Sequence, residues 1–196
     1  MPRIGLDLPT VVRAAAELAD AQGLEAVTLA SLAQKLQIRS PSLYNHVNGL
    51  PDLRRQMALS GLTQMTELFE RAIEGQTGDD SVRAFSYAYL AFARAHPGLY
   101  EAIQRAPEPD DEQLKEAGGR VVQMTVIALE SYGLKGDAAL HAVRGIRSVL
   151  HGFVSLERQG GFGLKLDLDV TFRLLVDTFL EGVKAMQAKA EEAQTR

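Results

Sequence analysis

Apolar residues recur along the chain at intervals of three and four positions, the spacing that places them on one face of an α-helix. Alternating β-branched runs bounded by turn signals, which would indicate strands, are missing. The pattern therefore predicts an all-α protein of about nine helices. Their expected ranges are about 9–22, 28–36, 40–49, 52–75, 81–96, 97–103, 121–132, 138–159 and 169–189.

Residues near the ends of the first three helices have the chemistry of caps. Asp7 is expected to begin the first helix, Gly23 to end it, and Thr28 to cap the second. In the third, Ser40 is the expected N-cap. Pro41 follows as the first helical residue, where its missing N–H would have lacked an intrahelical partner anyway.

The third segment, SPSLYNHVNG at residues 40–49, is too short to be stable without packing. Leu43 and Val47 are four positions apart and can both point inward. Two short helices joined by residues 37–39 match a helix-turn-helix, with the second as recognition helix. The alternative is an ordinary helical hairpin in which Tyr44 and His46 only pack. The side chains expected to face outward are Ser42, Tyr44, Asn45 and His46.

The net charge of −4 argues weakly against a nucleic-acid partner, but the charges are not evenly distributed. Within residues 33–60 the four basic residues are offset only by Asp52, so the local balance is +3. This excess fits a DNA-binding segment, although a solvated surface would give the same count. The basic residues are Lys35, Arg39, Arg54 and Arg55.

Residues 27–53, VTLASLAQKLQIRSPSLYNHVNGLPDL, resemble the DNA-binding segment of TetR-family repressors, especially the tetracycline repressor branch. The family's turn glycine is Gln37 here, which in a left-handed conformation costs about 1 kcal/mol. A frequent phosphate-binding lysine is replaced by Leu50. The resemblance and the neighbouring charges and hydroxyls imply DNA contacts from Thr28, Ser31, Arg39, Ser40, Pro41, Ser42, Tyr44, Asn45, His46, Arg54 and Arg55.

Residues 144–157 and 160–163 resemble the C-terminal regulatory domain called WHG in part of the same family, although this chain has no Trp. The resemblance implies an effector-binding and dimerisation domain. We therefore expect a helix-turn-helix DNA-binding domain at residues 1–50 and a helical-bundle domain for effector binding and dimerisation at residues 51–196.

The segment 121–132 is apolar on nearly every side, which predicts a buried central helix that could line a ligand cavity. An ordinary core role remains the alternative for each candidate, and Arg147 could instead pair with a nearby acid. The candidate effector-pocket residues are Phe85, Tyr89, Phe92, Tyr100, Met124, Ile127, Arg147 and His151.

The last two long helices carry surfaces suited to a symmetric four-helix dimer interface. Gly145 and Gly152 are seven positions apart on a seam of small residues, and the final helix has a continuous apolar stripe. A repressor that reads a two-fold operator needs such a dimer. The candidate interface residues are Gly145, Val149, Gly152, Leu156, Phe172, Val176, Phe179 and Val183.

Catalytic and metal motifs are missing from the sequence. Its four histidines are scattered, it has no cysteine, and no P-loop or Gly-x-Ser-x-Gly motif occurs. We expect no enzymatic activity, no cofactor and no metal. No signal peptide or membrane span is evident, which predicts a cytoplasmic protein without a membrane partner.

The expected function is a dimeric DNA-binding repressor, released from double-stranded operator DNA by an unknown small-molecule effector. The alternative is a helical ligand-binding or enzymatic bundle that keeps a helix-turn-helix as scaffold.

Overall fold

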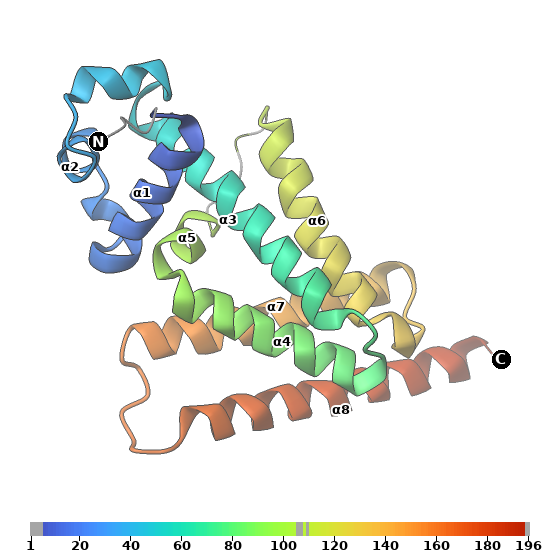
Figure 1. Cartoon of the computed structure of the whole chain (residues 1–196). Coiled ribbons are helices and arrows are strands. Elements are labelled where there is room, and N and C mark those ends of the chain that lie inside the picture. Colours follow the sequence, from blue (N-terminus) through green and yellow to red (C-terminus); the bar gives the residue numbers. More distant parts are fainter. Residues whose placement is uncertain (1–5, 105–107, 109, 195–196) are drawn as a thin grey trace. The chain divides into compact units, whose positions relative to one another are not determined.

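The computed structural model describes residues 6–104, 108 and 110–194. Over these residues all regular structure is helical, with eight α-helices and three short 3-10 helices (Figure 1). The all-α prediction is confirmed, and each of the nine predicted helices has a counterpart. The chain forms two compact units, residues 1–65 with 92–119 and residues 66–91 with 120–196.

The first unit begins with α1 (Leu8–Gln22), η1 (Leu24–Ala26), α2 (Leu29–Lys35) and η2 (Ser40–Asn45). It also contains most of α3 (Gly49–Ile73), the whole of α5 (Pro97–Ala102) and the start of α6 (Glu112–Ala128). The predicted functional boundary between residues 50 and 51 therefore lies within α3. That division of roles stays a prediction.

Local signals explain where the first helices begin and end. The Asp7 carboxylate accepts the N–H of Thr10 at 2.9 Å, and Gly23 has a positive φ of 87° while its N–H donates to the Ala19 carbonyl. Thr28 and Ser31 form a reciprocal capping box at the start of α2. The expected caps at Asp7, Gly23 and Thr28 are confirmed.

Helix α1 packs closely against α5 in the first unit. A Cβ atom added at Gly98 would clash with the side chain and backbone of Ala19, so only glycine allows this approach. The Gly98 N–H also donates to the Asp20 carboxylate at 2.7 Å. Because α1 also packs against α2, the first helix of the helix-turn-helix, these contacts connect that segment to α5 through α1.

The second unit contains the end of α3, most of α4 (Gly78–Ala95), the end of α6 and η3 (Glu130–Tyr132). It is completed by α7 (Gly136–Arg158) and α8 (Leu168–Gln194), which pack against each other. Aromatic rings fill its core. Phe69 lies 4.4 Å from Phe85 between ring centroids, and Phe153 lies 5.0 Å from Phe172.

The structure corrects two expectations about helices. The third segment is a 3-10 helix, and Arg39, not Ser40, occupies its N-cap position, with no side-chain hydrogen bond. Helix α6 is not buried on all sides, because Val122 and Ile127 are 40% and 39% exposed. Only one face of α6 is buried, and apolar residues also occupy positions outside that face.

None of the described helices combines the length and apolar character needed to cross a bilayer.

Candidate functional site

The turn between α2 and η2 depends on a left-handed residue. Gln37 has φ = 55° and is the one non-glycine residue with positive φ in the described part of the chain. Its N–H donates to the Gln34 carbonyl, and the Ile38 N–H donates to the Ala33 carbonyl. The N–H groups of Gln37 and Ile38 thus both have partners where α2 ends. Glycine would adopt the positive φ of Gln37 more easily.

The η2 segment is anchored by two buried side chains and presents the others outward. Leu43 is fully buried and Val47 is 2% exposed, which confirms the expected anchors. A helix of six residues is not stable by itself and depends on packing, and 3-10 geometry is common in such short pieces. Here the Ser42 N–H donates to the Arg39 carbonyl, and the His46 N–H donates to the Leu43 carbonyl.

The outward side of η2 carries the predicted DNA-contacting residues. Tyr44 is 61% exposed. The exposed residues of the predicted set also include Arg39, Pro41 and Asn45, while Ser40, Ser42 and His46 are half-buried. Thr28 and Ser31 lie at the start of α2, where their hydroxyls already serve the capping box and Ser31 also donates to the Ala26 carbonyl.

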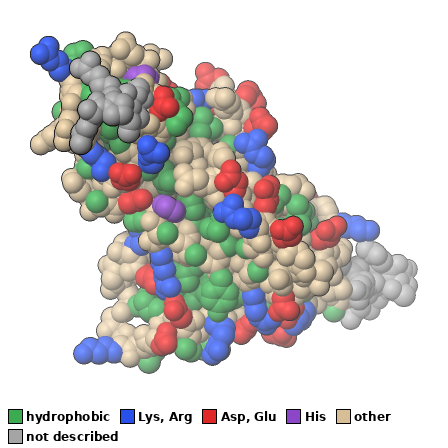
Figure 2. All heavy atoms as spheres, in the orientation of Figure 1, with side chains coloured by type: hydrophobic (Ala, Val, Ile, Leu, Met, Phe, Trp, Pro, Cys, Tyr) green, Lys and Arg blue, Asp and Glu red, His purple; other side chains and the backbone are tan. Residues whose placement is uncertain are grey.

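Most of the basic residues in this region have acidic partners. Arg39 is the exception among the four basic residues of segment 33–60, within the part of the chain that the structure describes. Figure 2 shows basic and acidic side chains interspersed over the face it presents. The pairs are Lys35–Glu17 at 3.0 Å, Arg54–Glu25 at 3.0 Å and Arg55–Asp111 at 2.6 Å.

The predicted effector residues are divided between the two units. Phe85 and Tyr89 are buried against Phe69 in the second unit. Phe92 and Tyr100 are buried in the first unit. Of the others, Met124 and His151 are half-buried, and Ile127 and Arg147 are exposed.

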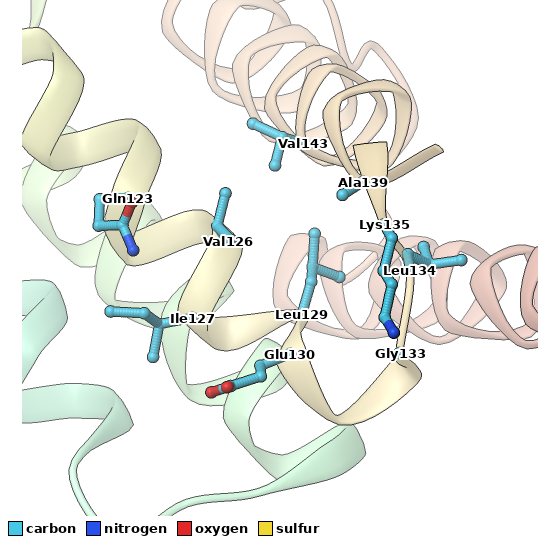
Figure 3. Close-up of a pocket in the computed structure, with 10 residues that line it drawn as sticks. All are labelled: Gln123, Val126, Ile127, Leu129, Glu130, Gly133, Leu134, Lys135, Ala139 and Val143. Atoms are coloured by element: carbon cyan, nitrogen blue, oxygen red, sulfur yellow. The ribbon is translucent and has the colours of Figure 1, made fainter. Parts of the chain in front are cut away.

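A cleft of about 240 Å³ lies between the end of α6, the following loop and the start of α7. Ile127 is the one predicted effector residue that lines it. Apolar side chains from α6 and α7 point into the space between these helices (Figure 3). The lining residues are Gln123, Val126, Ile127, Leu129, Glu130, Gly133, Leu134, Lys135, Ala139 and Val143.

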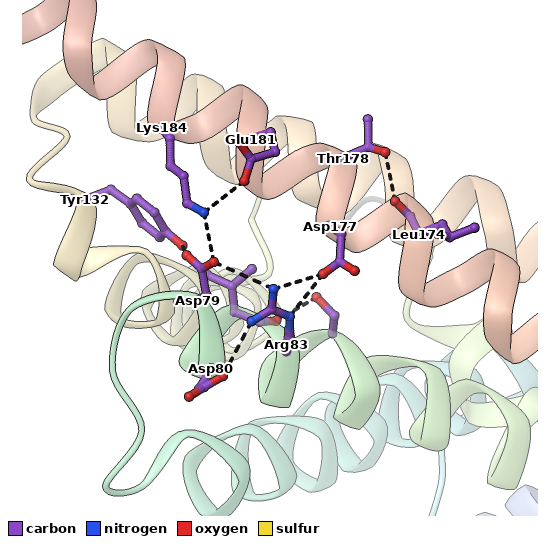
Figure 4. A network of polar contacts seen from close by, with 11 residues as sticks. Asp79, Asp80, Arg83, Tyr132, Leu174, Asp177, Thr178, Glu181 and Lys184 are labelled. Carbon is purple, nitrogen blue, oxygen red and sulfur yellow. Dashed lines mark hydrogen bonds and ion pairs between the residues drawn. The ribbon is translucent and has the colours of Figure 1, made fainter.

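A polar network holds η3, which contains Tyr132, in place (Figure 4). The buried Tyr132 donates its hydroxyl hydrogen to Asp79 at 2.6 Å, and Lys184 donates to the other Asp79 oxygen at 2.9 Å. Arg83 joins the network through Asp79, whose carboxylate lies 3.6 Å away, and it also pairs with Asp177 at 3.0 Å. The hydrogen bond from Tyr132, with that from Lys184, holds the pKa of Asp79 below its usual range.

The predicted dimer residues divide between the interior and the surface. Phe172, Val176 and Val183 are almost completely buried inside this chain, so they have little surface to offer a second copy. Phe179 is half-buried, and a Cβ atom added at Gly145 would lie 3.2 Å from its ring. Val149 and Gly152 are half-buried and Leu156 is exposed, whereas the exposed Leu140, Val170 and Leu174 were not predicted.

Among the described residues, no group of three or more His, Asp or Glu side chains could hold a metal ion.

Comparison with known proteins places the chain in a family. The family of tetracyclin repressor-like C-terminal domains matches residues 82–179. The HTH-type transcriptional regulator YobS of Bacillus subtilis is 36% identical over 183 residues, which cover 93% of this chain and 95% of YobS. Rv0681 of Mycobacterium tuberculosis, a regulator of the same type, is 35% identical over 191 residues, 97% of this chain and 87% of Rv0681.

The fold is also that of solved TetR structures. A variant of TetR from Acinetobacter baumannii AYE, in complex with minocycline, superposes with a TM-score of 0.70 at 19% identity, covering 93% of this chain and 98% of that one. Together with the helix-turn-helix geometry at residues 28–47, these similarities establish that the chain belongs to the TetR family of DNA-binding transcriptional regulators.

Proposed function

We propose that this regulator is a homodimeric repressor that binds two-fold operator DNA through residues 28–46 and is released by a small-molecule effector. The observation that carries the DNA-binding role is the exposure of Tyr44 and Asn45 on a segment anchored by Leu43 and Val47. A scaffold would not need these polar side chains at the surface.

The exposed side chains suit the major groove of DNA. An Asn amide can donate to and accept from an adenine edge, and a Tyr hydroxyl can reach a phosphate or a base. Asn45 therefore reads sequence in this proposal, while Tyr44 and Arg39 position the segment. The capping hydroxyls of Thr28 and Ser31 keep the start of α2 ordered beside it.

The cleft between α6 and α7 is the proposed effector site. Its walls are mainly apolar, and Gln123, Glu130 and Lys135 supply polar and charged groups. Such a lining suits a small compound with an apolar body and one polar or charged end. The effector would act by favouring a conformation of the dimer that no longer fits adjacent major grooves.

The proposed dimer surface uses the outward faces of α7 and α8. On α7 the small or apolar positions Ser148, Gly152 and Leu156 follow at intervals of four, and all three are at least partly exposed. On α8 the same spacing joins four exposed residues. A face with this pattern lets the helices of a second copy approach closely. The α8 residues are Val170, Leu174, Thr178 and Gly182.

The direct test is the double substitution Tyr44→Ala with Asn45→Ala. Affinity for DNA from the protein's own promoter region should fall about tenfold or more, as expected when a base-reading contact is lost. Fluorescence anisotropy measures the affinity, and light scattering checks that the molar mass is unchanged. Tyr87→Ala, at an exposed tyrosine on α4, is the control. Unchanged DNA affinity in the double variant would refute the assignment of η2 as the recognition segment.

A further inference from the structure

Arg55 on α3 is held by the start of α6 through three hydrogen bonds. Its Nε donates to one Asp111 carboxylate oxygen at 2.6 Å, and a terminal nitrogen donates to the other at 2.9 Å. The same nitrogen donates to the Gln113 amide oxygen at 2.8 Å. A bidentate Arg–carboxylate pair is among the strongest and most directional contacts between side chains. The partners are 56 and 58 positions apart, so this contact connects distant parts of the chain.

Asp111 has a second role at the same place. Its Oδ1 atom accepts the N–H of Leu114 at 3.1 Å and thereby caps the first turn of α6. The Asp111 side chain is only 10% exposed, and the Arg55 guanidinium holds the pKa of this carboxyl below its usual range. The carboxylate therefore remains ionised at neutral pH while it binds both α3 and its own helix.

The first turn of α3 is also bound to the short connection that follows η2. Asp52 accepts the N–H of Asn48 at 2.8 Å, and Asn48 lies three positions after the end of η2. Arg55 follows Asp52 by three positions, in the next turn of the helix, so the two side chains are neighbours on one face of α3. Two neighbouring side chains at the start of α3 thus make these contacts: Asp52 binds Asn48, after the end of η2, and Arg55 binds the cap of α6.

We propose that Asp111 and Arg55 are positioning residues for operator binding. Their ion pair holds the first two turns of α3, and with them η2, against the start of α6, and Arg55 is not a phosphate contact. This inference rests on the proposed DNA-binding function. It revises the sequence-based expectation that Arg55 meets DNA.

The two roles for Arg55 predict opposite effects of Asp111→Asn. If the pair positions η2, loss of the carboxylate lowers operator affinity. If Arg55 contacts phosphate and Asp111 competes for it, the same change releases Arg55 and raises affinity. Glu112→Gln is a matched control, because it removes one negative charge at the next residue, where Glu112 pairs with Lys115 alone in the described chain.

The experiment measures promoter-DNA affinity as a function of salt for Asp111→Asn, Arg55→Gln, the double variant and Glu112→Gln. We expect each single change to weaken binding by roughly fivefold or more, and the double variant to be no weaker than either, because both remove the same contact. The slope of log affinity against log salt should not change. Stronger binding by Asp111→Asn, or a slope reduced by about one in Arg55→Gln, would overturn the proposal.

Hydrogen exchange in the free protein tests the connection without DNA. Amides of residues 48–55 should exchange faster in Asp111→Asn than in the wild type or Glu112→Gln. Equal exchange in all three would overturn the proposed positioning role. Failure of wild-type protein to bind promoter DNA, with this exchange difference present, would instead reject the proposed DNA-binding function and leave the connection between α3 and α6 established.

Discussion

Arg39 differs from the other basic residues of the helix-turn-helix, because it has no acidic partner in the described chain. Its exposed guanidinium can therefore approach a phosphate without first breaking an ion pair. Lys35, by contrast, would have to leave Glu17, which lies 3.0 Å away. The electrostatic part of DNA binding should thus depend on Arg39 more strongly than the local charge of +3 would suggest.

Replacing Arg39 by Ala should reduce the salt dependence of promoter-DNA binding. The slope of log affinity against log salt is expected to fall by about one, because one phosphate contact is lost. Lys35→Ala should change the slope less. Titrations by fluorescence anisotropy at several salt concentrations measure both slopes. Equal slopes for Arg39→Ala and the wild type would show that Arg39 does not contact phosphate.

At the level of helices and turns, the described network around Asp79 joins three elements that are far apart in sequence. Tyr132 belongs to η3, Asp79 to the first turn of α4 and Lys184 to α8. Burial, together with the hydrogen bond to Asp79, raises the pKa of the Tyr132 hydroxyl above its usual value of 10.0. Folding therefore favours the protonated phenol, and its stabilising effect is complete below pH 10 and is lost as the pH rises further.

Tyr132→Phe should lower the free energy of unfolding by about 1–2 kcal/mol at pH 7, because the hydrogen bond to Asp79 is lost. Above pH 10 the wild type should lose stability more steeply than the variant, whose residue 132 cannot ionise. Urea unfolding followed by circular dichroism between pH 7 and 11 measures both effects. Tyr87→Phe, at an exposed tyrosine, is the control. Parallel pH profiles for Tyr132→Phe and the wild type would contradict this role of Tyr132.

Features set by neighbouring residues were predictable from the sequence. The caps at Asp7 and Thr28 and the anchors Leu43 and Val47 depend on side chains within a few positions of one another. The 3-10 geometry of η2 was not predicted, because α and 3-10 helices share the same signals in so short a segment.

Features that depend on distant residues were not predictable. The charge count over residues 33–60 could not include Glu17, Glu25 or Asp111, which folding brings beside that segment. Periodicity likewise showed an apolar stripe on α8 but not what covers it. Phe172 lies in the aromatic core, whereas Leu174, two positions later, is 56% exposed. Which apolar residues remain for a partner is decided by tertiary packing.

For the whole molecule, dimerisation and DNA binding are linked in the proposed function, because an operator with two half-sites is held by two recognition segments. Gly152 offers a way to separate dimerisation from folding. Apart from the neighbouring residues and backbone of its own helix, a Cβ atom at this position would have no heavy atom within 4 Å, and the same holds for Gly119 on α6. A side chain can therefore start at either position without a clash in the single chain, and replacing a helical glycine by a better helix former favours folding.

Gly152→Arg should therefore yield a folded monomer, while Gly119→Arg remains a dimer. Sedimentation velocity measures the mass, and circular dichroism confirms the helix content. Promoter-DNA affinity of Gly152→Arg should fall by about a hundredfold or more, since a single recognition segment loses the avidity of two linked ones. A dimeric Gly152→Arg protein would exclude the proposed face of α7. A monomer with undiminished affinity would instead show that one copy suffices for binding, and that the operator is not read as two half-sites.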